Sequence, residues 1–422
     1  MLSYFSLSKA KLITCIALLI GLTILGYSTV YRAAWGEKSR TDLTVYLRAA
    51  EAIPDGENIY AVENQRHWHY VYLPLLAILL IPFTSLPLWL NALLWYALSI
   101  ATLFGTFWGL KTLFRDQERG WAVISACFLV ALPPLLNTLT RGQLGALSLF
   151  LTLLPFILDQ SGKKFTAGFI LGFAIVLKMS PLLILPFYFL LNRNWRALAG
   201  CAAGGFLFGL LIPTLIFGPE LHYVFLRNYY DAISGGTGNL AHQSYLWGEL
   251  FTPFAGDNQS FYAVLTRFYW KTEALFIGHS NGLIRKVNFI FLLTLLAAVT
   301  LHFFKSKKEI RKALGPWQPK IKNEFTVYSL LSCIMLFTSP VSQLHHFTPL
   351  VLLSASAFLQ SELHPSSRKM LWGAMALCLI FFTTGMIFDS LAVLGLPLWG
   401  SLALWFVVLI SYGKNNPNPS PS

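Results

Sequence analysis

Long apolar segments separated by short polar ones run through almost the whole chain. Most of these segments approach the roughly 20 residues that a helix needs to cross a bilayer. The pattern therefore predicts an all-α, polytopic membrane protein. The clearest apolar segments are Leu12–Tyr31, Leu86–Leu110, Trp121–Leu139, Leu144–Leu158, Ala197–Phe217, Val287–Phe304, Phe347–Leu359, Leu371–Phe388 and Leu391–Tyr412.

The composition agrees with a membrane protein. Only 12% of the 422 residues are charged, about half of the roughly 25% in a soluble globular domain. We expect a single transmembrane domain over residues 1–412, whose first apolar segment is a retained helix and not a cleaved signal peptide. The tail 413–422, GKNNPNPSPS, is polar and Pro-rich and is expected to be disordered.

Clusters of basic residues set the expected orientation. The formal net charge of +13 does not indicate nucleic-acid binding, because the run KSKKEIRKALGPWQPKIK lies between apolar segments and fits a cytoplasmic loop (about 305–324). With that loop and Asn192–Arg196 inside, the loops 32–70, 218–285 and 339–346 face outward. We expect short surface helices in these outer loops, and a bacterial inner membrane with the site on its periplasmic face.

The middle of the chain allows two topologies. Charge bias places Lys111–Arg119 and Lys163 inside and Arg141 outside, which requires Tyr72–Leu86 and Phe165–Leu191 to form short re-entrant or broken hairpins. Broken helices are tolerated at membrane depth where they line a cavity. The alternative places Arg141 inside and needs no broken pair, but it violates the charge rule, so we favour the first topology.

Asp42 stands out among the acidic residues of the first outer loop. Most acids of the outer loops fit solvated surface, but Asp42 directly precedes an apolar stripe with helical spacing. Such a helix would lie on the membrane surface with the stripe against lipid or protein. Asp42 is then either a carboxylate that suits the helix N-terminus or a reactive group. The stripe consists of Leu43, Tyr46, Leu47 and Ala50.

Cations and amides that interrupt apolar sequence form a second group of candidates. The stretch TRGQLGA places Arg141 and Gln143 between two apolar segments, and AIVLKMSPLL places Lys178 just before a proline. An ionisable residue inside a membrane segment is costly and marks a functional site by default. For Lys178 the alternative is snorkelling toward an interface, which its separation from both flanking polar loops disfavours.

The outer segment SPVSQLHHFTPL carries the adjacent residues His345 and His346. Neighbouring helical residues point about 100° apart, so the two rings are not expected to share a metal, and we expect one structural and one functional histidine. The chain has no HExxH, CxxC, GxSxG, Walker, GxGxxG or Asp-x-Asp pattern. In the large outer loop, Gln243–Tyr245 and Gln259–Phe261 repeat a Gln-Ser-aromatic pattern that suits sugar binding or is ordinary loop surface.

An outer-face carboxylate, nearby buried cations and the lack of a metal motif together suggest one transfer chemistry. The carboxylate deprotonates an acceptor hydroxyl while the cations stabilise a departing lipid phosphate. The donor arrives from the bilayer, so no nucleotide site is needed. Three alternatives remain: a lipid-linked sugar flippase or other transporter, a ligase-like transferase with a diphosphate-linked donor, and a purely structural membrane protein.

Six stretches also match one family pattern in order: TDLTVYLRAAEAIPDGENIY, YVYLPLLAILLIPFTSLP, RGQLGALSLFLTLLPFIL, KKFTAGFILGFAIVLKMSPLLILPFYFLLNRNWRAL, NQSFYAVLTRF and SPVSQLHHFTPLVLL. They cover most of Asp42–Leu353. On these motifs the chain resembles glycosyltransferase family 87, the polyprenol-phosphate-mannose-dependent mannosyltransferase-like branch of the GT-C superfamily.

The resemblance implies a GT-C fold, an outer-face active site and a hexosyltransferase with a polyprenyl-phosphate donor, the sugar being mannose or another hexose. It implies a lipid or glycan acceptor, Asp42 as the catalytic base, and no metal or cofactor. Leu144 and Gln343 depart from the residues common in the family, which leaves the sugar and the acceptor open. We expect the donor phosphate to bind Lys178, Arg141, His345 and His346, and the substrates to bind Tyr46, Tyr60, Tyr72, Gln143, Gln259 and Gln343, with Trp68 near the entrance.

Overall fold

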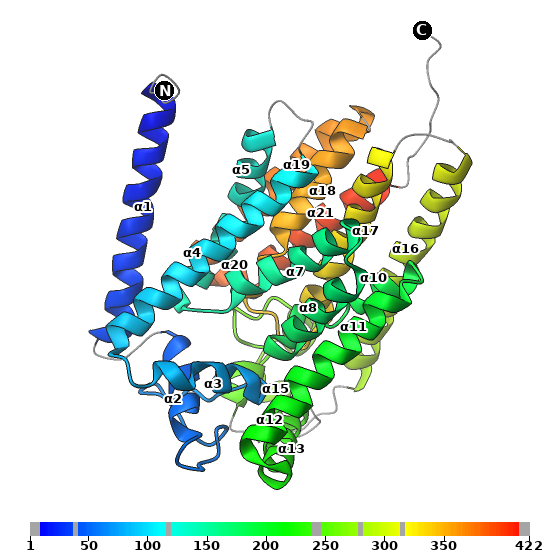
Figure 1. Ribbon diagram of the computed structural model, residues 1–422. Coiled ribbons are helices and arrows are strands. Elements are labelled where there is room, and N and C mark those ends of the chain that lie inside the picture. Colours follow the sequence, from blue (N-terminus) through cyan, green and yellow to red (C-terminus); the bar gives the residue numbers. More distant parts are fainter. Residues whose placement is uncertain are drawn as a thin grey trace, which may run out of the picture.

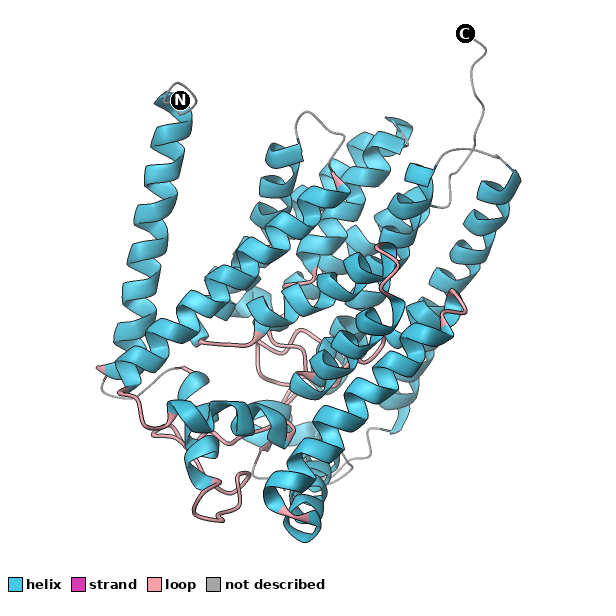
Figure 2. Ribbon diagram, viewed as in Figure 1, coloured by secondary structure: helices cyan, strands magenta, loops and turns pink. Residues whose placement is uncertain are grey.

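The chain folds into a bundle that is almost entirely helical (Figure 2). The computed structural model describes residues 9–36, 41–114, 120–237, 246–276, 282–312, 317–363 and 365–412. The longer helices are α1 (Lys9–Ala34), α4 (Leu88–Leu113), α7 (Gly145–Gln160), α8 (Lys164–Leu177), α11 (Trp195–Phe206), α13 (Pro219–Thr237), α16 (Gly282–Lys312), α17 (Trp317–Thr338), α18 (Leu350–Leu363), α19 (Arg368–Ile387) and α21 (Leu396–Tyr412). The shorter ones are α2 (Leu43–Ala52), α3 (Pro74–Leu80), α5 (Gly120–Val130), α6 (Leu132–Arg141), α9 (Met179–Leu182), α10 (Pro186–Leu191), α12 (Ile212–Phe217), α14 (Phe261–Trp270), α15 (Glu273–Phe276) and α20 (Asp389–Val393).

Five helical segments of the described residues are long and apolar enough to cross a membrane, and the prediction of an all-α polytopic membrane protein is confirmed. A sixth span results if α5 and α6, which are bent by 66° at a short break, are counted together. The continuous apolar segment predicted over this pair is therefore two helices. The five spans are Ile16–Ala34, Leu88–Leu113, Trp195–Phe217, Gly282–Lys305 and Pro365–Ile387.

Direct backbone contact between α8 and α11 holds one side of the bundle together. A Cβ atom added to Gly204 would lie 2.3 Å from the Phe169 carbonyl oxygen, and one added to Gly172 would lie 2.3 Å from the Cys201 carbonyl oxygen. Small residues four apart allow helices to approach this closely in a membrane, where association depends on packing. These glycines therefore fix the position of α8, which leads to Lys178.

The segment from α8 to α10 returns to the end of the bundle at which it begins. At the C-terminal end of α7, Asp159 accepts a hydrogen bond of 2.6 Å from Asn194 Nδ2, and Gln160 Nε2 lies 3.4 Å from the Tyr188 hydroxyl. Residues just before α8 and just after α10 are thus neighbours. At 14 residues, α8 is only about 21 Å long, shorter than a bilayer core of about 30 Å. The segment Phe165–Leu191 therefore has the broken, returning path that the sequence predicted, and its re-entrant course in a membrane stays a prediction.

The second expected hairpin, Tyr72–Leu86, takes a different form. It contains α3, one turn of 3₁₀ helix (Ile81–Phe83) and the turn into α4. Figure 1 shows α3 beside α2 at the lower end of the bundle, lying across the direction of the long helices. The segment is a short helix in the layer formed by the outer loops, and it does not form a hairpin within the bundle.

The two ends of the bundle differ in charge and in structure. Thr338 at the end of α17 accepts a 2.7 Å hydrogen bond from Asn288 near the start of α16, so the end of α16 and the start of α17, where the basic residues of both helices gather, lie at the opposite end. α16 and α17 extend into the predicted loop 305–324 from both sides. Its centre (313–316), the predicted disordered tail 413–422 and Gln243–Tyr245 lie outside the described residues.

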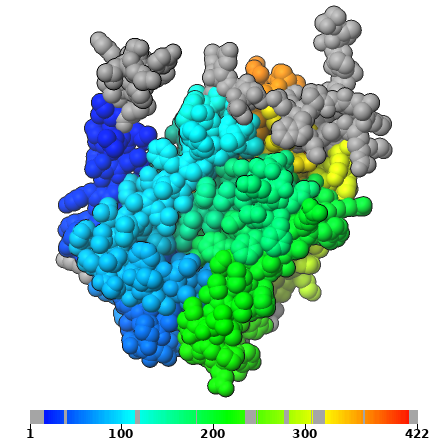
Figure 3. All heavy atoms as spheres, in the orientation of Figure 1, coloured from blue at the N-terminus to red at the C-terminus, as the bar shows by residue number. Residues whose placement is uncertain are grey.

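Loops and short helices gather at the other end, shown at the bottom of Figures 1 and 2. Here the first loop lies beside α13 in the space-filling view (Figure 3), and the rings of Tyr60 and Phe225 are 6.4 Å apart. The expected surface helices in the outer loops are confirmed by α2, α13, α14 and α15.

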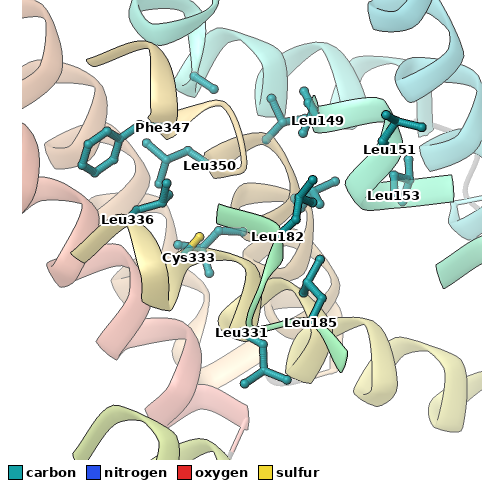
Figure 4. Packing of buried hydrophobic residues seen from close by; sticks show 14 of the residues in the cluster. Leu149, Leu151, Leu153, Leu182, Leu185, Leu331, Cys333, Leu336, Phe347 and Leu350 are labelled. Carbon is teal, nitrogen blue, oxygen red and sulfur yellow. The ribbon is translucent and has the colours of Figure 1, made fainter. Parts of the chain in front are cut away.

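A continuous apolar core lies above this layer. Figure 4 shows part of this core, with Leu149 and Leu153 of α7 near Leu182 of α9, and Leu331 of α17 beside Leu185; all of them are buried. Phe347, which precedes α18, belongs to the same core. The loops that carry the predicted site residues are therefore attached to a closely packed interior.

Candidate active site

The end of α6 places two of the predicted residues side by side. Gly142 terminates the helix with φ +63°, a left-handed conformation that glycine adopts without strain. A Cβ atom there would already lie 3.4 Å from Thr41 and from Leu43. The close turn brings Arg141 and Gln143 against the start of α2.

Asp42 is the centre of the site. Its carboxylate accepts a short hydrogen bond from Gln143 Nε2 and lies 3.7 Å from Arg141 Nε. Its backbone N–H donates to the Arg141 carbonyl oxygen at 2.7 Å. Arg141 therefore lies at the Asp42 end of the bundle, as the favoured topology requires.

The carboxylate of Asp42 does not serve as a helix cap. Asp42 occupies the N-cap position of α2, but its side chain makes no capping hydrogen bond within the described residues. The side chain is only 13% exposed and points to Arg141 and Gln143 instead. The apolar stripe of α2 faces protein, because Leu43, Tyr46, Leu47 and Ala50 are all buried.

Two tyrosine hydroxyls lie within hydrogen-bond distance of the Gln143 side chain. The hydroxyls of Tyr46 and Tyr72 lie 3.1 and 3.2 Å from Gln143 Oε1 and 3.3 Å from each other. Because both hydroxyls can donate to Oε1, they orient the amide so that Nε2 faces Asp42. Tyr46, Tyr72 and Gln143 thus form one hydrogen-bonded unit around the carboxylate.

Lys178 stands at the break of the returning segment Phe165–Leu191. The chain leaves α8 here with extended backbone (φ −149°, ψ 97°), and Ser180, which precedes Pro181, is also non-helical, as expected before proline. The residue is 5% exposed, and its Nζ atom is buried with no hydrogen-bond partner among the described residues. The snorkelling alternative is therefore not what the structure shows.

The two histidines differ in their hydrogen bonds. His346 Nδ1 accepts a 3.2 Å hydrogen bond from the Gln343 backbone N–H, and this bond closes a capping box at the 3₁₀ helix Leu344–Phe347. His345 is buried, and its Nδ1 atom has no partner in the described part of the chain. His346 therefore has a structural bond, while His345 keeps an available nitrogen atom.

Electrostatic interactions connect these groups across three loops. Burial raises the pKa of Asp42 above its ordinary value of 3.8, while Arg141, the hydrogen bond from Gln143 and Lys178 oppose this shift. Burial lowers the pKa of His345 and of His346 well below 6.5, and Lys178 and Arg141 act in the same direction. Both imidazoles are therefore neutral at pH 7.

Three predicted substrate-binding residues make hydrogen bonds within the protein, although Gln259 Oε1 is buried with no partner among the described residues. Tyr60 donates to the Tyr72 carbonyl oxygen at 3.0 Å and packs against α13. Gln259 Nε2 donates to the carbonyl oxygens of Gly256 and Ala392 at 2.5 and 2.8 Å. Gln343 belongs to the capping box. These contacts help to build the loops around the site, and substrate binding by the three residues stays a prediction.

One neighbour of the site was not singled out from the sequence. Asp257 Oδ2 lies 3.8 Å from Arg141 Nη1, although Asp257 was grouped with the solvated acids of the large outer loop. Trp68, expected near the entrance, holds the Arg141 guanidinium 5.6 Å from its ring centre. The contact with Asp257 joins residues far apart in sequence, and no local motif marks it.

Helical spans and a charged, largely enclosed site at one end define a polytopic membrane protein with the components of a transfer centre. The chain belongs to glycosyltransferase family 87, whose sequence model matches residues 70–314, more than half of its length. This match includes Arg141, Gln143 and Lys178, but it begins after Asp42 and ends before His345.

Two solved structures show a distant likeness. ArnT from Cupriavidus metallidurans in the apo state is 13% identical with a TM-score of 0.42, and the same protein bound to undecaprenyl phosphate is 12% identical with a TM-score of 0.40. Each alignment covers 96% of this chain and 78% of the other. No curated protein sequence matches the chain. A likeness this low is no basis for transferring details.

Proposed function

We propose that this protein is a GT-C-type hexosyltransferase that moves a sugar from a polyprenyl-phosphate donor to a hydroxyl of a lipid or glycan acceptor. The acceptor oxygen forms a bond to the anomeric carbon, and the bond from that carbon to the phosphate oxygen breaks. Polyprenyl phosphate leaves with the electron pair, and the acceptor proton passes to Asp42. Membership of family 87 supports the reaction class, and the surroundings of Asp42 carry the assignment of the base.

The position of Asp42 suits a general base. Its carboxylate is largely enclosed, is held by Gln143 Nε2 and is free of a capping role. Burial raises its pKa while Arg141, the hydrogen bond from Gln143 and Lys178 oppose the rise, so the group is more basic than an exposed aspartate. A general base is most effective when its pKa lies closer to the working pH.

The leaving phosphate needs positive charge that is not neutralised elsewhere. Lys178 offers a buried ammonium without a partner among the described residues, and Arg141 Nε lies 3.7 Å from the Asp42 carboxylate. A buried, unpaired cation costs free energy that a phosphate ligand would recover. His345 Nδ1 adds a neutral polar atom near both cations.

The proposed reaction takes place at the outer face of the membrane. The basic end of α16, the basic start of α17 and the basic residues around Lys163 and Arg193 lie at the end opposite Asp42. Under the positive-inside rule that end is cytoplasmic. In a bacterial inner membrane the site would then face the periplasm, within reach of a donor embedded in the bilayer.

The test is product formation by the purified full-length protein in detergent. The protein is incubated with radiolabelled polyprenyl-phosphate mannose or polyprenyl-phosphate glucose together with a membrane lipid extract, and lipid products are separated and analysed by mass spectrometry. A new hexosylated product that needs intact Asp42 is expected. A flippase would give no product under these conditions, and that outcome with both donors would refute the proposal.

A further inference from the structure

The Arg141 guanidinium lies between two carboxylates. Its Nε atom is 3.7 Å from Asp42, its Nη1 atom is 3.8 Å from Asp257, and its centre lies over the Trp68 ring. The first loop, the end of α6 and the large outer loop therefore meet at this one side chain. When an arginine pairs with two carboxylates through different nitrogen atoms, both carboxylates together fix the orientation of its guanidinium.

The main chain around Asp257 is fixed to the loop that carries the histidines. The Asn258 side chain accepts a 3.1 Å hydrogen bond from the Ser342 N–H and donates at 3.2 Å to the Pro340 carbonyl oxygen. The Gln259 N–H donates to the Ser342 carbonyl oxygen at 2.7 Å. None of these bonds involves the carboxylate of Asp257, which pairs with Arg141.

Arg267 of α14 is hydrogen-bonded to the backbone of the same segment. Its Nη1 atom donates to the carbonyl oxygens of Pro253, Ala255 and Asn258 at 2.6, 3.0 and 2.9 Å. Burial lowers the pKa of Arg267 to about 10, and Asp257 opposes this shift. Asp257 therefore has two cationic neighbours, but the hydrogen bonds of Arg267 go to backbone oxygens, whereas Arg141 has the carboxylate of Asp257 as an ion-pair partner.

Stability alone does not account for Asp257. Its side chain is 41% exposed and that of Arg141 is 27% exposed, and ion pairs with such exposure contribute little to folding. An otherwise rigid segment nevertheless presents this one carboxylate to the arginine beside Asp42. A structural role predicts almost no consequence when the charge is removed.

We propose that Asp257 is a positioning residue for the transfer reaction: it holds the Arg141 guanidinium so that Nε faces Asp42 while the remaining N–H groups stay available to the donor phosphate. This inference rests on the proposed function. Asp257 also competes with Asp42 for the charge of Arg141, and so keeps the base from being over-stabilised in its ionised form. The residue acts through Arg141 and touches no reacting atom.

The charge distribution around Asp42 gives the sign of the expected effect. Arg141, Gln143 and Lys178 face the carboxylate and favour its ionised form, Tyr46 and Tyr72 adjoin it through Gln143, and the two histidines are neutral. In Asp257→Asn, Arg141 keeps Asp42 as an ion-pair partner and loses the competing carboxylate. The pKa of Asp42 then falls, and the acid side of the pH–rate profile shifts to lower pH.

In Arg141→Gln the effect is opposite, because a cation that lowers the pKa of Asp42 is lost and the acid side shifts to higher pH. The double variant Arg141→Gln with Asp257→Asn should match Arg141→Gln alone, since Asp257 acts through Arg141. At the optimum pH, kcat/KM for the donor should fall about two- to five-fold in Asp257→Asn, the range of one partly exposed ion pair.

The experiment measures kcat/KM for the polyprenyl-phosphate hexose that gives product with the wild type, between pH 4 and pH 9, together with the melting temperature. Asp231→Asn is the matched control, because Asp231 forms an exposed 3.8 Å ion pair with Arg227 on α13 away from the site. The inference would be overturned if the pH–rate profile of Asp257→Asn superimposed on that of Asp231→Asn. It would also be overturned if the effects of the two single substitutions on kcat/KM were additive in the double variant. Absence of product with the wild type would instead count against the proposed function.

Discussion

Replacing Asp42 by Asn removes the proposed proton acceptor and leaves most contacts of the side chain in place. The amide oxygen of Asn can still accept the hydrogen bond from Gln143 Nε2, while the attraction to Arg141 at 3.7 Å is lost. General-base catalysis contributes about 10²–10⁴-fold, which corresponds to about 3–5 kcal/mol in the activation free energy. Turnover should fall by that factor.

The same substitution should hardly affect folding. The Asp42 side chain makes no capping bond within the described residues, and the Arg141 side chain is 27% exposed, so the lost ion pair costs about 0.2–1 kcal/mol. In a protein of this length such a change shifts the melting temperature by about 2 °C or less. A large kinetic effect and a small thermal one are therefore expected together.

Initial rates of product formation and melting temperatures of purified Asp42→Asn, Asp231→Asn and wild type provide the measurement. Wild-type turnover should also decline as the pH falls through a pKa raised above 3.8, because only the ionised carboxylate accepts a proton. If Asp42 only stabilised the start of α2, Asn would be tolerated and Ala would lower stability without an effect on the chemical step. Near-normal turnover of Asp42→Asn would remove Asp42 from catalysis.

Three further predictions concern the surroundings of the site. Replacing Lys178 by Met or Ala should raise KM for the donor at least about ten-fold. Thermal stability should not fall, because the substitution removes a buried charge that has no partner among the described residues. Unchanged donor kinetics would contradict the proposed role of Lys178. His345→Ala should lower kcat/KM with little change in melting temperature, whereas His346→Ala should lower the melting temperature through the lost bond to the Gln343 N–H, and equal behaviour of the two variants would argue against the division. Gly204→Ala should cost about 1–3 kcal/mol in a denaturation assay, because the added methyl would lie 2.3 Å from a backbone oxygen, while Gly205→Ala, with nothing within 4 Å, should be tolerated.

The sequence indicated the candidate site residues more clearly than the bounds and course of the helices. Asp42, Arg141 and Lys178 could be found individually, because a charge beside or inside apolar sequence is expensive and rarely accidental. The sequence also located the break at Lys178, since a proline follows it closely. It did not reveal α17 as a long helix, because its first turns are polar and continue the basic segment.

Contacts between distant segments could not be predicted. The ion pair of Arg141 with Asp257 and the packing of Gly204 on Phe169 each join residues that are distant in the sequence and come together only in the folded protein. Neither contact is marked by a local sequence pattern. For the same reason, the sequence does not decide whether Gln259 and Gln343 bind a sugar or belong to ordinary loop surface. A polar side chain in an outer loop looks alike whether it binds a ligand or a backbone carbonyl.

The charges of the site fit the change in charge that the proposed reaction requires. Two cations, Arg141 and Lys178, face two carboxylates, Asp42 and Asp257, beside neutral imidazoles. During transfer the donor phosphate changes from a singly charged diester to a monoester with a second negative charge, while Asp42 gains a proton and becomes neutral. The negative charge therefore moves from the carboxylate to the phosphate between the same cations, and the total charge of the enclosed site does not change. In surroundings of low dielectric this avoids the large cost of creating new charge.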